Sequence, residues 1–281
     1  MMKIIVNRSM IIGIILTGAM VLLAVFAPWL APHDPNKANL DERLLSPVLT
    51  LSTEYPFGTD HHGRCIFSRT LFATRLSLII GISVIAVSLV AGTIMGSIAG
   101  YTGGIIDEMI MRVVDAFLSF PGLFVALAVA GIFGESIVGL VIALSIVEWT
   151  LYARISRGSV ISVKHMEYVS ASRLMGAGPS HIFRHHILPH ITSPLLVIST
   201  LGMGYAILAA ASLSFLGFGV SSYPELGMMV SDGRHFLQAA PHIMFFPGMF
   251  IVIIVLGFNF LGDGLRDIFD PRDSKERWRL F

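Results

Sequence analysis

Imidazole and thiol side chains are the most chemically specific groups in this sequence, because both are ligands for transition metals such as nickel and zinc. Several of them lie outside the long apolar runs, at His33, His61, His62, Cys65, His235 and His242. They come from three separate segments, so they could form a metal site only if the fold brought them together. Ordinary loop histidines are the competing interpretation.

A second set of residues places ionisable side chains next to apolar runs. Arg112 and Asp115 are three residues apart, so on a helix they share one face and can pair with each other. Glu148 lies inside an apolar run, close to its expected inner end. Because a charge at the centre of a bilayer costs about 2.5 to 3.5 kcal/mol, such residues are functional candidates. We expect gating or structural ion pairs here rather than a proton relay.

The composition excludes several classes of function. Of the 281 residues, 54% are hydrophobic and 13% charged, whereas an ordinary soluble domain has about 25% charged residues. The net charge of +1 offers nucleic acid no electrostatic attraction. The single cysteine cannot close an intrachain disulfide. No lysine follows a glycine, so the sequence has no phosphate-cradling Gly-Lys loop and we expect no cofactor bound by this chain.

Long apolar runs predict an all-α polytopic membrane protein. A bilayer core of about 30 Å needs about 20 mostly apolar residues per helix. Six runs fit, at about residues 9–32, 76–100, 113–133, 137–152, 191–216 and 243–261. The third run contains Pro121-Gly122, which a membrane helix tolerates as a kink.

Six spans place both termini on the same side of the membrane. If that side is the cytoplasm, the outer segments hold only six of the 19 lysines and arginines, namely Lys37, Arg43, Arg64, Arg69, Arg75 and Arg234. Cytoplasmic loops carry the excess of basic residues, so we predict cytoplasmic N- and C-termini. The predicted parts are an anchor helix with an extracytoplasmic segment at 1–75, a five-helix core at 76–270 and a cytoplasmic tail at 271–281.

The longest inner connection predicts a bent pair of short helices between spans four and five. Residues 167–175 have helical character, Gly176 is typical of a helix C-terminus, and Pro179 suits the first position of a second helix. Pro189 is expected to end that second helix. We name residues 165–189 the coupling segment. On periodicity alone, it could equally seat in a groove of a partner protein or lie flat on lipid.

Several motifs resemble those of ABC importer membrane subunits. The usual coupling motif has Glu-Ala-Ala, three residues, Gly, nine residues and Ile-x-Leu-Pro; Gly176 and Leu188-Pro189 match it, whereas Ser170, Ser172 and His186 depart from it. Further runs resemble the peptide and nickel permeases over almost the whole chain: 57–60 (FGTD), 63–64 (GR), 68–69 (SR), 214–217 (SFLG), 262–267 (GDGLRD) and 270–271 (DP). Cys65 and Leu226 depart from the family's usual residues.

The resemblance implies half of a heterodimeric translocation pathway, contributed by the second (C-type) permease subunit. Its partners would be another permease, two cytoplasmic ATPases that use ATP and Mg, and an extracytoplasmic binding protein, with the chain itself spanning the inner membrane and not acting as an enzyme. The ATPase-docking residues would be Glu167, Tyr168, Ser170, Ala171, Gly176, Ala177, Pro179, Leu188 and Pro189.

The cargo is predicted from shorter runs of residues. Short runs at 73–75, 152–154 and 171–174 resemble the nickel branch more than the peptide branch, so nickel, free or chelated, is the favoured cargo. A di- or oligopeptide importer of the same family is the alternative. An ion-coupled secondary carrier is a distant one, because such carriers show paired halves and midplane sites that this sequence lacks.

Overall fold

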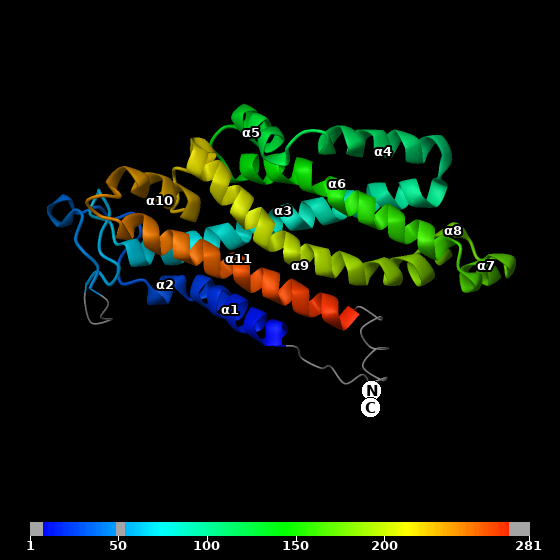
Figure 1. Cartoon of the computed structure of the whole chain (residues 1–281), viewed down its shortest axis with the longest axis horizontal. Helices are drawn as coiled ribbons and strands as arrows, with labels where there is room; N and C mark the ends of the chain where they lie inside the picture. Colours follow the sequence, from blue (N-terminus) through cyan, green and yellow to red (C-terminus); the bar gives the residue numbers. More distant parts are fainter. Residues whose placement is uncertain (1–7, 49–53, 270–281) are drawn as a thin grey trace.

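The computed structural model describes residues 8–48 and 54–269. Figure 1 shows an elongated bundle of helices, and the described residues contain one isolated bridge, between Thr59 and Cys65, but no strand. Inside a bilayer every backbone amide needs a partner within the protein, and a helix supplies that partner from its own chain. The predicted all-α class is therefore confirmed. The proposed tail at 271–281 lies outside the described residues.

Within residues 8–48 and 54–269, five helical stretches are long and apolar enough to cross a membrane, and a bent pair raises the number to six if it counts as one span. The five are α1 (Arg8–Val25), α3 (Ile66–Thr102), α6 (Ile137–Lys164), the continuous stretch Pro179–Phe218 that contains α8 (Pro179–Ile182) and α9 (Leu188–Leu213), and α11 (His242–Phe269). The shorter helices are α2 (Ala27–Leu30), α4 (Gly104–Leu118), α5 (Gly122–Phe133), α7 (Glu167–Leu174) and α10 (Leu226–Gly233).

The third predicted span is broken rather than kinked. Helices α4 and α5 meet at 90° across residues 119–121. Proline has no amide hydrogen and disfavours helical geometry in the residue before it, so α4 ends at Leu118 and Pro121 caps α5 instead of continuing α4. With 12 residues, α5 is about 18 Å long, which is shorter than the bilayer core. The expectation of one kinked helix over 113–133 is wrong.

Two spans are longer than their apolar runs. Helix α3 begins ten residues before the predicted start at 76, and α6 continues to Lys164 instead of ending at Tyr152. The extension of α6 is held by α4 and the end of α3: Arg157 donates to Asp107 at 2.5 and 2.7 Å, and Lys164 donates to the Tyr101 carbonyl oxygen at 2.5 Å. A hydropathy pattern predicts only the part of a helix that lies in lipid. The polar contacts described here stabilise a further part of α6 that the apolar run does not include.

Helices α3 and α6 pack closely because small residues line their contact. A Cβ atom at Gly96 would collide with the carbonyl oxygen of Ala153, and one at Gly100 would lie 2.8 Å from that of Arg157. Ser145 donates across the same contact to the Val84 carbonyl oxygen at 3.4 Å. Such close approach is the usual way in which membrane helices gain van der Waals contact without a hydrophobic driving force.

The connection between α2 and α3 is organised around a buried carboxylate. Asp60 accepts hydrogen bonds from the backbone amides of His62 and Arg64 at 2.8 and 2.9 Å. It also pairs with the guanidinium groups of Arg64 at 2.7 Å and Arg69 at 3.6 Å. Arg69 is only 7% exposed and donates to the Pro35 carbonyl oxygen at 3.0 Å. The motif residues at 57–69 therefore act together as one structural unit.

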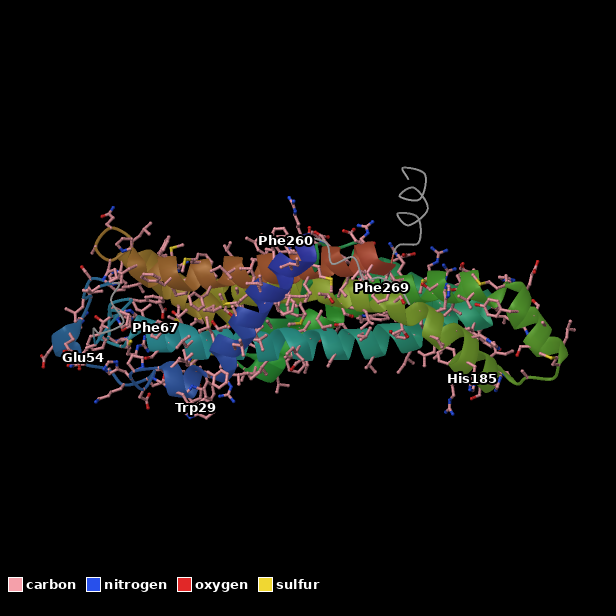
Figure 2. The ribbon with its side chains drawn as sticks, turned by 90° about the horizontal axis from the view of Figure 1, so that it is seen from below. Trp29, Glu54, Phe67, His185, Phe260 and Phe269 are labelled. Carbon is pink, nitrogen blue, oxygen red and sulfur yellow. The ribbon has the colours of Figure 1, made fainter. Side chains whose placement is uncertain are left out.

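The α2–α3 connection and the coupling segment lie at opposite ends of the bundle. Figure 2 places Glu54 and Phe67 at one end and His185 at the other, with α1 crossing the bundle obliquely between them. Phe57 stacks on Phe246 of α11 with 3.9 Å between ring centroids, which anchors the connection to the last helix. This arrangement is consistent with the prediction that the two segments lie on opposite sides of the membrane. The cytoplasmic location of the termini stays a prediction.

Candidate functional site

The coupling segment projects from one end of the bundle as a helix, a tight turn and a second helix. Helix α7 carries Glu167 in its first turn and Arg173 in its last, and both charges complement the helix dipole. Val169 is fully buried against the bundle, whereas Leu174 and Met175 at the end of α7 are 90% and 82% exposed. Two large apolar side chains are thus held in the open at the outermost point of the segment.

The turn after α7 has the hydrogen bonds of a Schellman motif. The Gly176 amide donates to the Arg173 carbonyl oxygen at 3.0 Å, and the Ala177 amide donates to that of Ser172 at 3.1 Å. Gly176 has φ of +88°, which a residue with a Cβ adopts only at a cost. Pro179 is the first residue of α8. The predicted helix end at Gly176 and the predicted start at Pro179 are both confirmed.

Pro189 does not end the second helix, contrary to expectation. Residues Phe183–Ile187 form a wide π-helical turn in which the Leu188 amide donates to the Phe183 carbonyl oxygen, and α9 continues directly from it. Pro189 lies in the first turn of α9, where the wider turn accommodates its missing amide hydrogen. The second helix of the coupling segment, which begins at Pro179, and the fifth span therefore form one continuous helical stretch.

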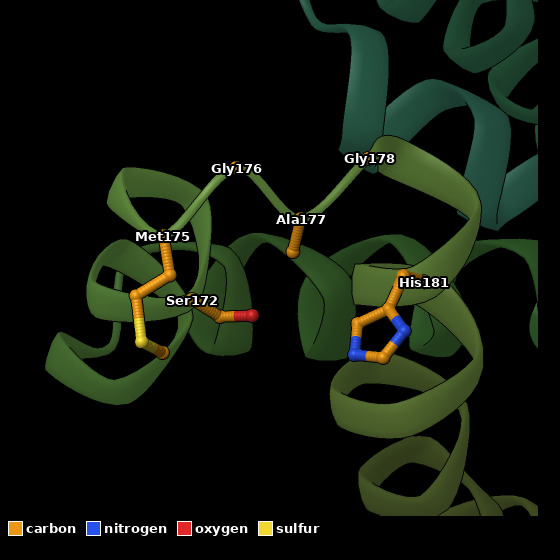
Figure 3. Close-up of a pocket in the computed structure, with 6 residues that line it drawn as sticks. All are labelled: Ser172, Met175, Gly176, Ala177, Gly178 and His181. Carbon is orange, nitrogen blue, oxygen red and sulfur yellow. The ribbon is translucent and has the colours of Figure 1, made fainter.

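A hollow of about 370 Å³ lies inside the turn (Figure 3). Its lining residues are Ser172, Met175, Gly176, Ala177, Gly178 and His181. The thioether of Met175 and the imidazole of His181 stand on its two sides, so the hollow is apolar on one side and polar on the other. Leu174, Met175 and His181 were not among the residues predicted from the sequence to dock a partner, although a pair of apolar residues before a helix-ending glycine was a signal for the first two.

The residues selected from the sequence for docking lie mostly on the outside of the coupling segment. Tyr168 is 46% exposed and its ring lies 5.6 Å from that of His186, whereas Leu188 is 40% exposed further along. The others are exposed, except for the half-buried Ala177: Glu167, Ser170, Ala171, Gly176, Pro179 and Pro189. The surface that they form is consistent with contact to another protein, and their role in docking stays a prediction.

The ionisable residues near the bilayer have partners other than those expected. Arg112 pairs with Glu108 at 3.3 Å, one turn away on α4. Asp115 instead faces α6 and pairs with Arg154 at 2.8 Å. The expected pair between Arg112 and Asp115 is therefore wrong, because an acceptor on the same helix and a donor on the neighbouring helix offer better geometry. Glu148 lies near the middle of α6 but only four residues before Tyr152, where the apolar run was predicted to end, so its place near the inner end of that run stays a prediction.

The candidate metal ligands converge only in part. The ring centroid of His61 lies 4.0 Å from that of His62 and 4.9 Å from that of Phe236, on which His61 stacks. The α2–α3 connection therefore contacts the segment that contains His235. His242 Nε2 lies 3.4 Å from the Thr59 carbonyl oxygen, and Cys65 is buried at the start of α3. Among the described residues, no group of three His, Cys, Asp or Glu side chains is arranged to hold a metal ion.

A buried acid that sequence analysis did not select connects the end of the fifth span to α10. Glu225 is 2% exposed, accepts a hydrogen bond from the Ser214 hydroxyl and accepts another from the Val220 amide at 3.0 Å. Burial raises the pKa of its carboxyl, although these two hydrogen bonds oppose the rise. Ser214 opens the 214–217 motif, so this contact gives part of that motif a structural role.

Two family models together match most of the chain. Residues 92–275 match the family described as the binding-protein-dependent transport system inner membrane component. Residues 3–47 match the N-terminal transmembrane domain of oligopeptide transport permease C.

Full-length relatives are similar over nearly the whole chain. The dipeptide transport system permease protein DppC of Alkalihalophilus pseudofirmus is 43% identical over 95% of this chain and 86% of its own length. The nickel transport system permease protein NikC of Escherichia coli K12 is 39% identical, over 94% of each chain. Among solved structures, the MetNI methionine ABC transporter matches 69% of this chain and 94% of its own, with a TM-score of 0.53 at 20% identity.

Proposed function

The chain belongs to the inner-membrane permeases of binding-protein-dependent ABC importers, as a C-type subunit of the peptide and nickel group, and from this premise we propose that the coupling segment transmits the work of ATPase subunits to the translocation pathway. As a permease the chain is a transport subunit and not an enzyme, and ATP is hydrolysed on separate subunits. Permeases of this family generally work with a second permease, ATPase subunits and a substrate-binding protein.

The observation that carries the coupling proposal is the pair of exposed apolar side chains on a rigid turn. Large side chains that fill a partner's pocket supply most of the binding energy at protein interfaces. Leu174 and Met175 are the most exposed large apolar residues of the coupling segment, and the turn at Gly176 fixes their position. The continuous helix from Pro179 then connects this point to the membrane. We propose two ATPases, a second permease and a binding protein as the partners, with ATP and Mg bound by the ATPases.

Replacing Gly176 with valine is expected to uncouple transport while leaving the permease in the membrane. The left-handed backbone at this position costs a residue with a Cβ about 1 to 2 kcal/mol, which corresponds to roughly a tenfold loss of the docking-competent turn. The measurement is cargo uptake together with co-purification of the ATPase subunits.

Gly178→Val is the matched control for the Gly176 variant. A Cβ at either glycine meets no atom within 4 Å, but Gly178 has φ of −72° and ψ of 163°, an extended conformation that valine adopts without strain before a proline. Uptake should therefore fall in the Gly176 variant alone. Equal uptake by the two variants would contradict a role for the turn in coupling.

For the cargo, we propose short peptides of dipeptide size, with nickel as the second candidate. Dipeptide permeases of Alkalihalophilus pseudofirmus and Haemophilus influenzae, at 43% and 38% identity, support the peptide. The nickel permease of Escherichia coli at 39% identity supports nickel, which the short runs at 73–75, 152–154 and 171–174 also favour. Peptide comes first because further relatives in Escherichia coli K12 and Pseudomonas aeruginosa, at 39% and 38% identity, are also dipeptide or di/tripeptide permeases.

Uptake of a labelled dipeptide and of labelled nickel, in cells with and without this gene, tests the cargo directly. Deletion should abolish dipeptide uptake, and nickel uptake should persist through other routes. Loss of nickel uptake alone would assign the chain to the nickel branch and would make His61, His62 and His235 worth replacing.

A further inference from the structure

The membrane-embedded part of α6 contains an acid whose role the coupling proposal does not explain. Glu148 is half-buried near the middle of the helix. No described side chain forms a hydrogen bond or ion pair with its carboxylate, whereas Asp107 and Asp115 of α4 each pair with an arginine of α6. Ionisable groups in membrane-spanning helices are costly, and they almost always face a protein interior or a water-filled path.

Other polar groups gather beside Glu148 where α6 contacts α9. Tyr152 lies one helical turn further along the same face of α6 and is fully buried. Its hydroxyl lies next to that of Ser199 on α9, yet neither makes a hydrogen bond of good geometry. Gly202 leaves the space for this hydroxyl, because a Cβ there would lie 3.0 Å from it. Two buried hydroxyls are thus held without partners in an apolar region.

The same contact opens toward the outside of the chain. Tyr205 of α9 lies within electrostatic range of Glu148 and is 52% exposed. Leu151 and Leu208, one turn from Glu148 and Tyr205, are 43% and 48% exposed. An acid beside exposed side chains in a membrane-spanning helix needs a polar surrounding, and a pathway shared with a second permease would provide one.

The chemistry of these groups selects a positively charged ligand. A carboxylate attracts a cation, hydroxyl oxygens accept hydrogen bonds from an ammonium group, and tyrosine rings attract cations through their faces. We propose that Glu148, Tyr152, Ser199 and Tyr205 form a transit site for the positively charged group of the cargo. This inference rests on the proposed function, in which the cargo carries either the ammonium group of a peptide or a divalent metal charge.

The test compares Glu148→Gln with the wild type in liposomes that contain the complete importer. Cargo transported and ATP hydrolysed are measured together, with a labelled dipeptide in one arm and labelled nickel in the other. Glutamine keeps the shape and one acceptor oxygen but removes the charge, so cargo transported per ATP should fall about tenfold, the factor expected when a hydrogen bond to a charged group becomes one to a neutral group. ATP hydrolysis stimulated by the binding protein should stay unchanged, and Glu148→Asp should restore part of the transport.

The matched control is Glu108→Gln, which removes an exposed acid of α4 and should transport at the wild-type ratio. A fall in the dipeptide arm assigns the site to an ammonium group, and a fall in the nickel arm assigns it to a divalent cation. Wild-type ratios in the Glu148 variant would overturn the transit site, as would an equal fall in ATP hydrolysis and transport, which indicates a helix-positioning role. If the wild-type importer transported neither cargo, the cargo proposal itself would fail, and the transit site with it.

Discussion

Gly96→Ala is expected to prevent most of the permease from reaching its folded state. The added methyl group would collide with the backbone carbonyl oxygen of Ala153, which cannot move without separating α3 from α6 along their whole contact. Alanine favours helices by up to about 1 kcal/mol over glycine, but overpacking costs about 1 to 3 kcal/mol, and a contact with a backbone atom that cannot yield lies at the upper end of that range and decides the sign. The amount of monodisperse protein after detergent extraction, and its thermal unfolding temperature, measure the effect.

Gly158→Ala is the matched control, because it adds the same methyl group to α6 where no atom lies within 4 Å. This variant should keep or slightly raise the unfolding temperature, since only the helix propensity changes. If the two alanine variants unfolded at the same temperature, the close approach of α3 and α6 at Gly96 would be wrong.

Asp60→Asn is expected to destabilise the α2–α3 connection by about 3 to 5 kcal/mol, the usual cost of removing one partner from a buried ion pair. The substitution leaves the guanidinium of Arg69, which is 7% exposed, with the Pro35 carbonyl oxygen as its only remaining acceptor among the described residues. Thermal unfolding at neutral pH measures the loss. Asp34→Asn, an exposed acid in the same connection, is the control and should change little.

The effect of Asp60 should depend on pH in a defined direction. Burial by itself would raise the pKa of this carboxyl, but the amide and charge of Arg64, the charge of Arg69 and the His62 amide outweigh burial and lower the pKa from its usual value. A carboxyl with a lowered pKa in the folded state contributes stability above its unfolded pKa and loses it as pH falls through the folded value. Wild type and Asp60→Asn should therefore differ fully at neutral pH and converge in strong acid. A difference that grew toward acid would contradict this assignment.

The sequence predicted the features that depend on local chemistry. Apolar runs located the membrane helices, because the cost of placing polar groups in lipid is set by each run itself. Gly176 and Pro179 marked the turn of the coupling segment, because a left-handed residue and a fixed φ are properties of single residues. The motifs identified the family, which the relatives confirm.

Features that depend on distant partners could not be predicted in this way. The partner of Asp115 is Arg154, 39 residues away, and no helical spacing rule points to it. The extension of α6 depends on Asp107 and Tyr101 of other helices. The 90° break near Pro121 could not be predicted either, because proline in a membrane helix is also compatible with a mere kink. Whether the span kinks or breaks depends on how the neighbouring helices pack against it.

The helical stretch from Pro179 to Phe218, whose kink at Gly217 lies only at its far end, has a mechanical consequence. Its 40 residues, at about 1.5 Å per residue, measure about 60 Å, which is about twice the thickness of the hydrocarbon core. One end carries the turn at Gly176, and the other end is fastened to α10 through Ser214 and Glu225. If a helix of this length pivots in the membrane, its two ends move in opposite directions. A displacement of one end on one face of the bilayer therefore produces an opposite displacement of the other end on the other face, within a single helix.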